Sequence, residues 1–165
     1  MNYLIDTNIL VIYVRDTDLT RRLEEDLRLL AGDNNLVISV VSIGEIKSIA
    51  KQNKWGEKRV RRLIEILSQF LIADINVEDI IESYSEIDTY SQGKLSGKAT
   101  SFTSRNMGKN DLWIAATAST LNLELITTDK DFDHLNEDYL QLKRIDLSEY
   151  SNEKGYYSAW GLKYA

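Results

Sequence analysis

Several residue types that build common catalytic and structural sites are missing from this sequence. There is no cysteine, which excludes disulfide frameworks, zinc sites with thiolate ligands and thiol catalysis. The only histidine is His134, which excludes a histidine-rich metal site and disfavours a catalytic triad built on histidine. Proline is absent as well, and nothing functional follows from its absence. Any chemistry must therefore come from carboxylates, hydroxyls, amides, lysines and arginines.

Long apolar runs and an excess of positive charge are also lacking. No run approaches the roughly 20 apolar residues of a membrane-spanning helix, and the N-terminus does not resemble a signal peptide, so we expect a cytoplasmic protein with no membrane partner. Twenty Lys and Arg against 26 Asp and Glu give a net charge of −6, which excludes a generally basic nucleic-acid-binding surface. Residues 47–62 are nevertheless basic, with seven cations, including Lys47, against one acid. Solvation explains such a run simply, and phosphate binding is the functional alternative.

Short apolar runs alternate with longer amphipathic ones, which is typical of a parallel α/β sheet. Strands are predicted at 3–5, 36–38, 71–72, 124–127 and 142–145. Helices are predicted at 42–53, 58–70, 77–90 and 111–121, and in two segments before residue 31. Residues 91–109 are rich in Ser, Thr, Gly and Lys and are predicted to form a long loop. We expect one domain over residues 1–147 and an aromatic-rich extension at 148–165.

Four carboxylates stand where a predicted strand ends or a predicted helix begins: Asp6, Glu45, Asp111 and Asp129. Because open parallel sheets bind ligands at the carboxyl ends of their strands, we expect these side chains to converge there. Four converging carboxylates repel one another and raise their pKa values unless a cation is present. Oxygen ligands are what Mg²⁺ or Mn²⁺ prefers, so the pattern favours a divalent metal site.

Each of the first three acids also has an explanation that needs no metal. Asp6 fits an Asx turn at the end of its strand. The segment from Ser42 to Glu45 matches a capping box at a helix start. Asp111 suits the first turn of a helix, where it complements the helix dipole. The metal site is therefore predicted from the joint placement of the acids and not from any one of them.

The acids after the fourth strand invite comparison with a calcium-binding loop. Asp129, Asp131 and Asp133 alternate as the ligands of such a loop do. The loop is excluded because His134 stands where the turn glycine belongs and Leu140 where the bidentate Glu belongs. Asp133 and His134 are accordingly predicted to be surface residues.

Four segments carry a resemblance to a known family, in that family's order: 3–10 (YLIDTNIL), 41–46 (VSIGEI), 110–118 (NDLWIAATA) and 125–132 (LITTDKDF). On these motifs the chain resembles the PIN-domain ribonucleases, especially the VapC-type toxins of bacterial toxin–antitoxin pairs. The resemblance implies a three-layer α/β/α sandwich with a central parallel sheet. It also implies a Mg²⁺- or Mn²⁺-dependent endoribonuclease that cuts tRNA or other structured RNA. A homodimer and a small antitoxin that inhibits the enzyme are implied as well.

Carried over motif by motif, the resemblance assigns catalytic roles to Asp6, Thr7, Glu45, Asp111, Asp129 and Asp131, with Asp6, Glu45, Asp111 and Asp129 as metal ligands. Asp131 is expected to support the site or to bind a second ion, and Thr7 to lie near the scissile phosphate. Thr127 or Thr128 is expected to hydrogen-bond the ligands or a phosphate. Substrate binding is expected of Asn8, Lys47, Arg105, Lys109 and Asn110, with ordinary solvation as the alternative for the cations.

Two other functions compete with a nuclease. One is a catalytically silent module of the same fold that binds nucleic acid or a protein partner, and the presence of all four acids argues against it. The other is a phosphotransfer domain with Asp6 as nucleophile. That reading is poor because Asn8 stands where such enzymes need a second aspartate.

Overall fold

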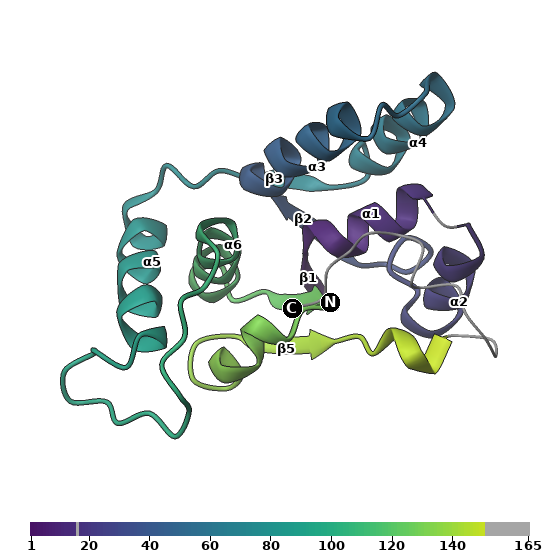
Figure 1. The fold of residues 1–165 in the computed structure, drawn as a ribbon. Helices are drawn as coiled ribbons and strands as arrows, with labels where there is room; N and C mark the ends of the chain where they lie inside the picture. Colours follow the sequence, from purple (N-terminus) through teal and green to yellow (C-terminus); the bar gives the residue numbers. More distant parts are fainter. Residues whose placement is uncertain (16, 151–165) are drawn as a thin grey trace.

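A computed structural model describes residues 1–15 and 17–150 of the chain. Five strands form one parallel sheet in the order β3-β2-β1-β4-β5 (Figure 1). The strands are β1 (Asn2–Ile5), β2 (Asn35–Ser39), β3 (Leu71–Ala73), β4 (Glu124–Thr127) and β5 (Gln141–Arg144). The order runs from β1 toward β3 on one side and from β1 to β4 and β5 on the other. The topological switch point therefore lies between β1 and β4, where open α/β sheets bind their ligands.

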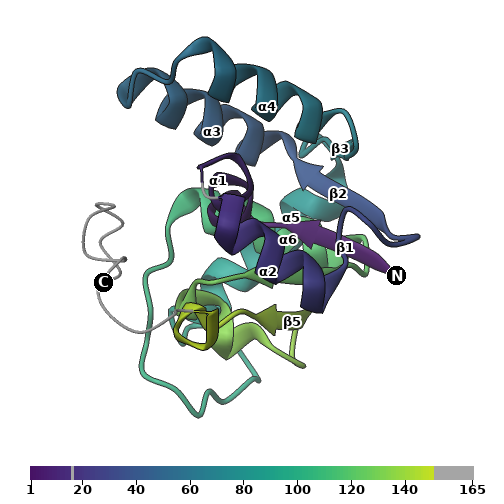
Figure 2. The ribbon, with the colours of Figure 1, turned by 90° about the vertical axis from the view of Figure 1, so that its right-hand side faces the viewer.

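Helices cover both faces of this sheet (Figures 1 and 2). The helices are α1 (Thr7–Arg15), α2 (Thr17–Leu27), α3 (Val40–Gln52), α4 (Glu57–Leu67), α5 (Glu78–Ser91) and α6 (Lys109–Thr120), with 3₁₀ turns η1 (Lys130–Leu135) and η2 (Leu147–Tyr150). Helices α1 to α4 pack on one face, and α5, α6 and η1 pack on the other. The predicted three-layer α/β/α sandwich is confirmed.

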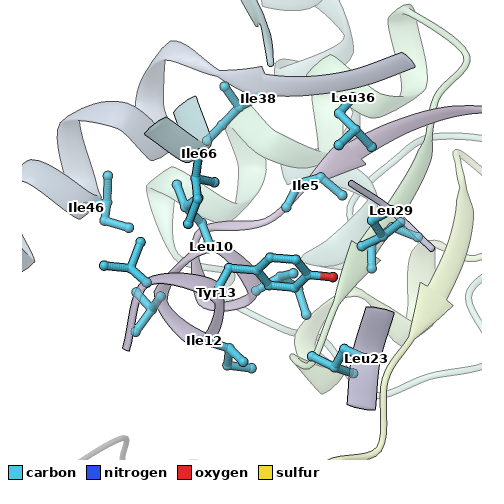
Figure 3. Packing of buried hydrophobic residues seen from close by; sticks show 14 of the residues in the cluster. Ile5, Leu10, Ile12, Tyr13, Leu23, Leu29, Leu36, Ile38, Ile46 and Ile66 are labelled. Atoms are coloured by element: carbon cyan, nitrogen blue, oxygen red, sulfur yellow. The ribbon is translucent and has the colours of Figure 1, made fainter. Parts of the chain in front are cut away.

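Alternation along β1 separates the two cores. Tyr3 and Ile5 point into the cluster under α1 to α4, whereas Leu4 points into the cluster under α5 and α6. Helix α1 is buried on nearly all sides, because its residues Ile9 to Val14 all lie in the first cluster. Figure 3 shows part of this packing, in which Tyr13 lies among aliphatic side chains. Because α1 is packed on nearly all sides, its first residues, which follow β1, are held in place.

The predicted loop at 91–109 is confirmed between α5 and α6, but its anchor was not predicted. Ser91 Oγ lies 2.8 Å from His134 Nε2, and the backbone N–H of Arg105 donates to the carbonyl of Ser91. The ring of Phe102, from the middle of the loop, meets the His134 ring edge-on at 4.8 Å. His134 is half-buried, so its prediction as a surface residue is correct only in part, because Ser91 and Phe102 contact its ring. Asp133 is exposed as predicted.

The end of the chain is described only in part. The η2 turn continues past the predicted domain boundary at residue 147, and Arg22 of α2 donates to the carbonyl of Tyr150. Residues 151–165, which make up most of the predicted extension, lie outside the described residues. Within residues 1–15 and 17–150, no helix is long and apolar enough to span a membrane.

Candidate active site

Four elements bring carboxylates to the carboxyl edge of the sheet at the switch point. Asp6 follows β1 directly, and its backbone N–H donates to the carbonyl of Ile126 in β4, 3.1 Å away. One residue separates Asp129 from the end of β4. Glu45 lies on α3 after β2, and Asp111 lies in the first turn of α6. The predicted convergence thus comes from the parallel order of the strands.

Asp6 is buried and held at both oxygens. Its side chain is 4% exposed. Oδ1 accepts a hydrogen bond from the backbone N–H of Thr7 at 2.6 Å, and Oδ2 accepts one from Thr127 Oγ1 at 2.5 Å. The Asx turn proposed as an alternative is not formed, since the bond goes to the next residue and not to the N–H of Asn8. A buried carboxylate needs such partners, and here they also fix its orientation.

The hydroxyl of Thr127 forms hydrogen bonds with three residues at this edge of the sheet. Besides donating to Asp6, it accepts from the backbone N–H of Asp129 at 3.0 Å and from Asn8 Nδ2 at 3.3 Å. Asn8 in turn accepts from the backbone N–H of Thr128 at 3.4 Å. Thr127 is fully buried, so these bonds are shielded from water. Thr127 or Thr128 was predicted to hydrogen-bond a metal ligand, and Thr127 is the one that does so. In the described part of the chain, Thr128 Oγ1 is buried without a hydrogen-bond partner.

Glu45 lies on α3, which begins earlier than predicted. The N-cap is Ser39, whose side chain accepts from the backbone N–H of Val41. Ser42 therefore lies inside the helix and forms no capping box with Glu45, so that alternative was wrong. Instead, Glu45 Oε2 accepts a hydrogen bond from Thr7 Oγ1 at 2.6 Å. One residue of α1 thus bridges two acids, since the N–H of Thr7 binds Asp6 and its hydroxyl binds Glu45.

The remaining acids have simpler surroundings. Asp111 is partly buried in the first turn of α6, after the N-cap Gly108. A Cβ atom on Gly108 would lie 2.5 Å from Asp111 Oδ2, so the absence of a side chain there leaves room for the carboxylate. Asp129 is the N-cap of η1, and its Oδ1 accepts from the backbone N–H of Asp131 at 2.9 Å.

Burial of carboxylates beside one another is the main electrostatic feature of this cluster. Burial raises the pKa of Asp6 to about 7; hydrogen bonds from Thr127 and Thr7 oppose this rise, and the charges of Glu45 and Asp129 add to it. Burial likewise raises the pKa of Asp111 to about 7, and the charges of Asp6, Asp129, Glu45 and Asp131 add to the rise. The cluster is therefore short of positive charge at neutral pH.

The donor set suits a hard divalent ion in kind and charge. Carboxylate and hydroxyl oxygens are what Mg²⁺ and Mn²⁺ bind, and a cation would stabilise the ionised form of Asp6 and Asp111, which burial and the neighbouring acids disfavour. In residues 1–15 and 17–150, no group of three or more His, Cys, Asp or Glu side chains is placed to hold an ion as it stands. In the described structure, Asp6 and Glu45 each accept a hydrogen bond from a threonine hydroxyl at an oxygen that could otherwise bind an ion.

The residues expected to bind substrate lie around the acids and not among them. Lys47, Arg105 and Asn110 are exposed. The ammonium of Lys109 lies 3.5 Å from Asp88 Oδ2 on α5 and above the Tyr84 ring, at 6.0 Å from its centroid. Of the expected set, only Asn8 joins the hydrogen-bond network of the acids. Gly108 was not anticipated, although a glycine just before a helix start was visible in the sequence.

Comparisons with known proteins give one family and several similar structures. The model of the PIN domain family matches residues 3–138. A chain of the structure of VapBC2 from Rickettsia felis bound to a promoter DNA fragment is 27% identical, with a TM-score of 0.70 over 88% of this chain and 100% of that one. A chain of VapBC-1 from nontypeable Haemophilus influenzae is 26% identical, with a TM-score of 0.62 over 87% and 98%. A chain of a toxin–antitoxin complex from Klebsiella pneumoniae is 27% identical, with a TM-score of 0.57 over 79% and 89%. No curated protein matches the chain.

Proposed function

The chain belongs to the PIN domain family, and from this premise we propose that it is a divalent-metal-dependent endoribonuclease, the toxin of a toxin–antitoxin pair. The observation that carries the proposal is the acidic cluster at the switch point, where Asp6 and Asp111 both have pKa values near 7. A purely structural role does not account for so much uncompensated negative charge in one place. Hydrolysis of a phosphodiester at a metal-binding carboxylate cluster does account for it.

In this proposal Asp6, Asp111 and Asp129 hold the ion, and Glu45 either completes the ligand set or orients the attacking water. A bound Mg²⁺ or Mn²⁺ would supply positive charge beside the scissile phosphate and lower the pKa of water. The chain's own contribution is orientation. Thr127 fixes Asp6 relative to Asp129, and the hydroxyl of Thr7 fixes the carboxylate of Glu45.

No histidine is needed for this chemistry. His134, the only one in the chain, is engaged with Ser91 under the long loop. Proton transfer at the scissile phosphate is therefore assigned to water and Glu45. Asp131, whose charge helps to raise the pKa of Asp111, supports the site from the η1 turn.

The substrate and partners are proposed from the similar structures. Chains of the VapBC complexes and of the Klebsiella complex match most of this chain at 26–27% identity. We therefore propose a small antitoxin as partner, a homodimer as the assembly and the cytoplasm as the location. The proposed substrate is tRNA or another structured RNA, and residues 148–165 are proposed to extend the nuclease domain at 1–147.

The test is cleavage of a mixed RNA pool that includes tRNA, by purified protein with Mn²⁺, Mg²⁺ or EDTA. Asp6→Asn and Asp111→Asn variants are measured beside the wild type, with Asp33→Asn as the control, since Asp33 is an exposed acid that precedes β2 and so lies at the amino edge of the sheet, opposite the cluster. We expect metal-dependent cutting that both cluster variants lose and the control retains. Metal binding without any cutting would instead favour the silent module.

A further inference from the structure

A cationic cavity lies at the far end of α1 from the acidic cluster. Its volume is about 870 Å³, and its walls come from the last turn of α1 and from α4 with its N-cap residue. Among the residues that the structure describes, five cations and two acids line it, and the cations are Arg15, Lys58, Arg59, Arg61 and Arg62. Val14 is the one large apolar side chain among these described lining residues, so this part of the lining does not suit an apolar ligand.

Two of these cations are held in place by the protein itself. Arg62 Nε donates to the backbone carbonyl of Tyr13 at 2.7 Å, which leaves the terminal nitrogens of its guanidinium for other partners. Arg59 lies over the Trp55 ring, 5.5 Å from its centroid. Guanidinium groups that are already ordered lose less entropy when they bind an anion, and their planar donors match a phosphate.

The described acids of the lining are fewer than its described cations. Glu57 lies 4.0 Å from Arg61, and both side chains are largely exposed. Such a pair contributes little. The pKa of Arg15 is lowered by burial and then by the charge of Arg59, as expected for a partly buried cation near another cation. The cavity therefore carries net positive charge on a protein whose net charge is −6.

The position of the cavity relates it to the acidic cluster. Helix α1 begins at Thr7, which hydrogen-bonds Asp6 and Glu45, and ends at Arg15 in the cavity wall. Eight residue steps span about 12 Å at 1.5 Å per residue. A stacked strand advances about 3.4 Å along its axis per nucleotide, so three to four nucleotides cover that length. One RNA strand can thus reach both places.

We propose that this cavity binds a backbone phosphate of the RNA strand, three to four nucleotides from the bond that is cut. The proposal rests on the proposed nuclease function and adds to it a site that contributes to the affinity for RNA. The acidic cluster repels a polyanion, and the cavity supplies the attraction that offsets this repulsion. Contacts of this kind hold the backbone and carry no sequence information.

The test compares Lys58→Gln/Arg59→Gln with the matched control Arg21→Gln/Lys143→Gln, which removes the same two charges from exposed positions on α2 and β5. Arg62 is left in place because its bond to the carbonyl of Tyr13 also supports the fold. Binding of a 12-nucleotide single-stranded RNA is measured in EDTA over a range of salt concentrations. For the loss of this one phosphate contact we expect the salt slope to fall by about 0.7 and binding to weaken about tenfold, with the control unchanged.

Cleavage with Mn²⁺ provides the second readout. The ratio of wild-type to variant kcat/KM should be larger for the 12-nucleotide RNA than for a dinucleotide, which is too short to reach the cavity. If the wild type cuts RNA but the double variant matches its control in both readouts, the cavity proposal is wrong and the nuclease proposal stands. If the wild type cuts nothing, the nuclease proposal fails, and a lower slope in EDTA still supports a phosphate site. If the variant loses binding of a 12-residue polyglutamate peptide but not of RNA, the cavity takes an acidic protein segment and the proposal is overturned.

Discussion

Replacing Asp111 by asparagine should stabilise the metal-free protein at pH 8. In the folded chain the pKa of Asp111 is about 7, against 3.8 for a free side chain, so ionised Asp111 costs folding free energy at pH 8. A shift of three pKa units corresponds to about 4 kcal/mol, and partial exposure to water reduces this to about 2 kcal/mol. Asparagine has nearly the same shape and no charge. For a domain of this size the gain corresponds to a Tm higher by about 4 to 8 °C in EDTA.

The pH dependence has a definite sign. Because the folded pKa is raised, the folded protein binds more protons than the unfolded one between about pH 4 and 7. Wild-type stability is therefore recovered as the pH falls from 8 toward 4, and the advantage of Asp111→Asn shrinks over the same range. Thermal unfolding in EDTA at pH 8 and pH 5 measures both effects, with Asp33→Asn as the control. A variant that is less stable than the wild type at pH 8 would refute the claim that ionised Asp111 is destabilised by burial and by the neighbouring acids.

Three further substitutions test the contacts around the cluster and in the core. Thr127→Val removes the hydroxyl that joins Asp6, Asn8 and Asp129, so Mn²⁺ affinity and RNA cleavage should fall about 10- to 100-fold, while Thr127→Ser retains most of both. Gly108→Ala places a Cβ atom 2.5 Å from Asp111 Oδ2 and should weaken Mn²⁺ binding about tenfold; Gly44→Ala, which adds a Cβ atom in open space, should not. Tyr13→Phe removes the hydroxyl that donates to Glu24 at 2.6 Å and should cost about 1 to 2 kcal/mol in urea unfolding, with RNA cleavage retained. Equal Mn²⁺ affinity in Thr127→Val and wild type would remove Thr127 from its assigned role.

The sheet and its acidic edge were predictable because their signals are local. Continuous apolar runs such as Leu36 to Ile38 mark buried parallel strands, and the rule for ligands at the carboxyl ends of strands then places the acids. The start of α3 was less visible. Val40 and Val41 are β-branched and continue the pattern of β2, so the N-cap at Ser39 was missed and a capping box was inferred at Ser42.

Contacts between distant segments could not be read from the sequence. Thr7 and Glu45 are 38 residues apart, and the hydrogen bond between them depends on how α1 packs against α3. His134 is a single histidine in a polar stretch, and its burial depends on how the loop after Ser91 folds back over η1. Neither arrangement lies within one helix or strand, so no periodicity in the sequence predicts it.

The most direct test of the central claim is a calorimetric titration of the protein with Mn²⁺ in two buffers of different ionisation enthalpy. Asp6 and Asp111 should each be about half protonated at pH 7, since their pKa values are about 7. Because the ion binds carboxylates and displaces their protons, about one proton should be released per protein at pH 7 and almost none at pH 8.5. Asp111→Asn should bind Mn²⁺ more weakly and release fewer protons. Mn²⁺ binding that neither releases protons at pH 7 nor depends on Asp111 would contradict a metal site built on these carboxylates.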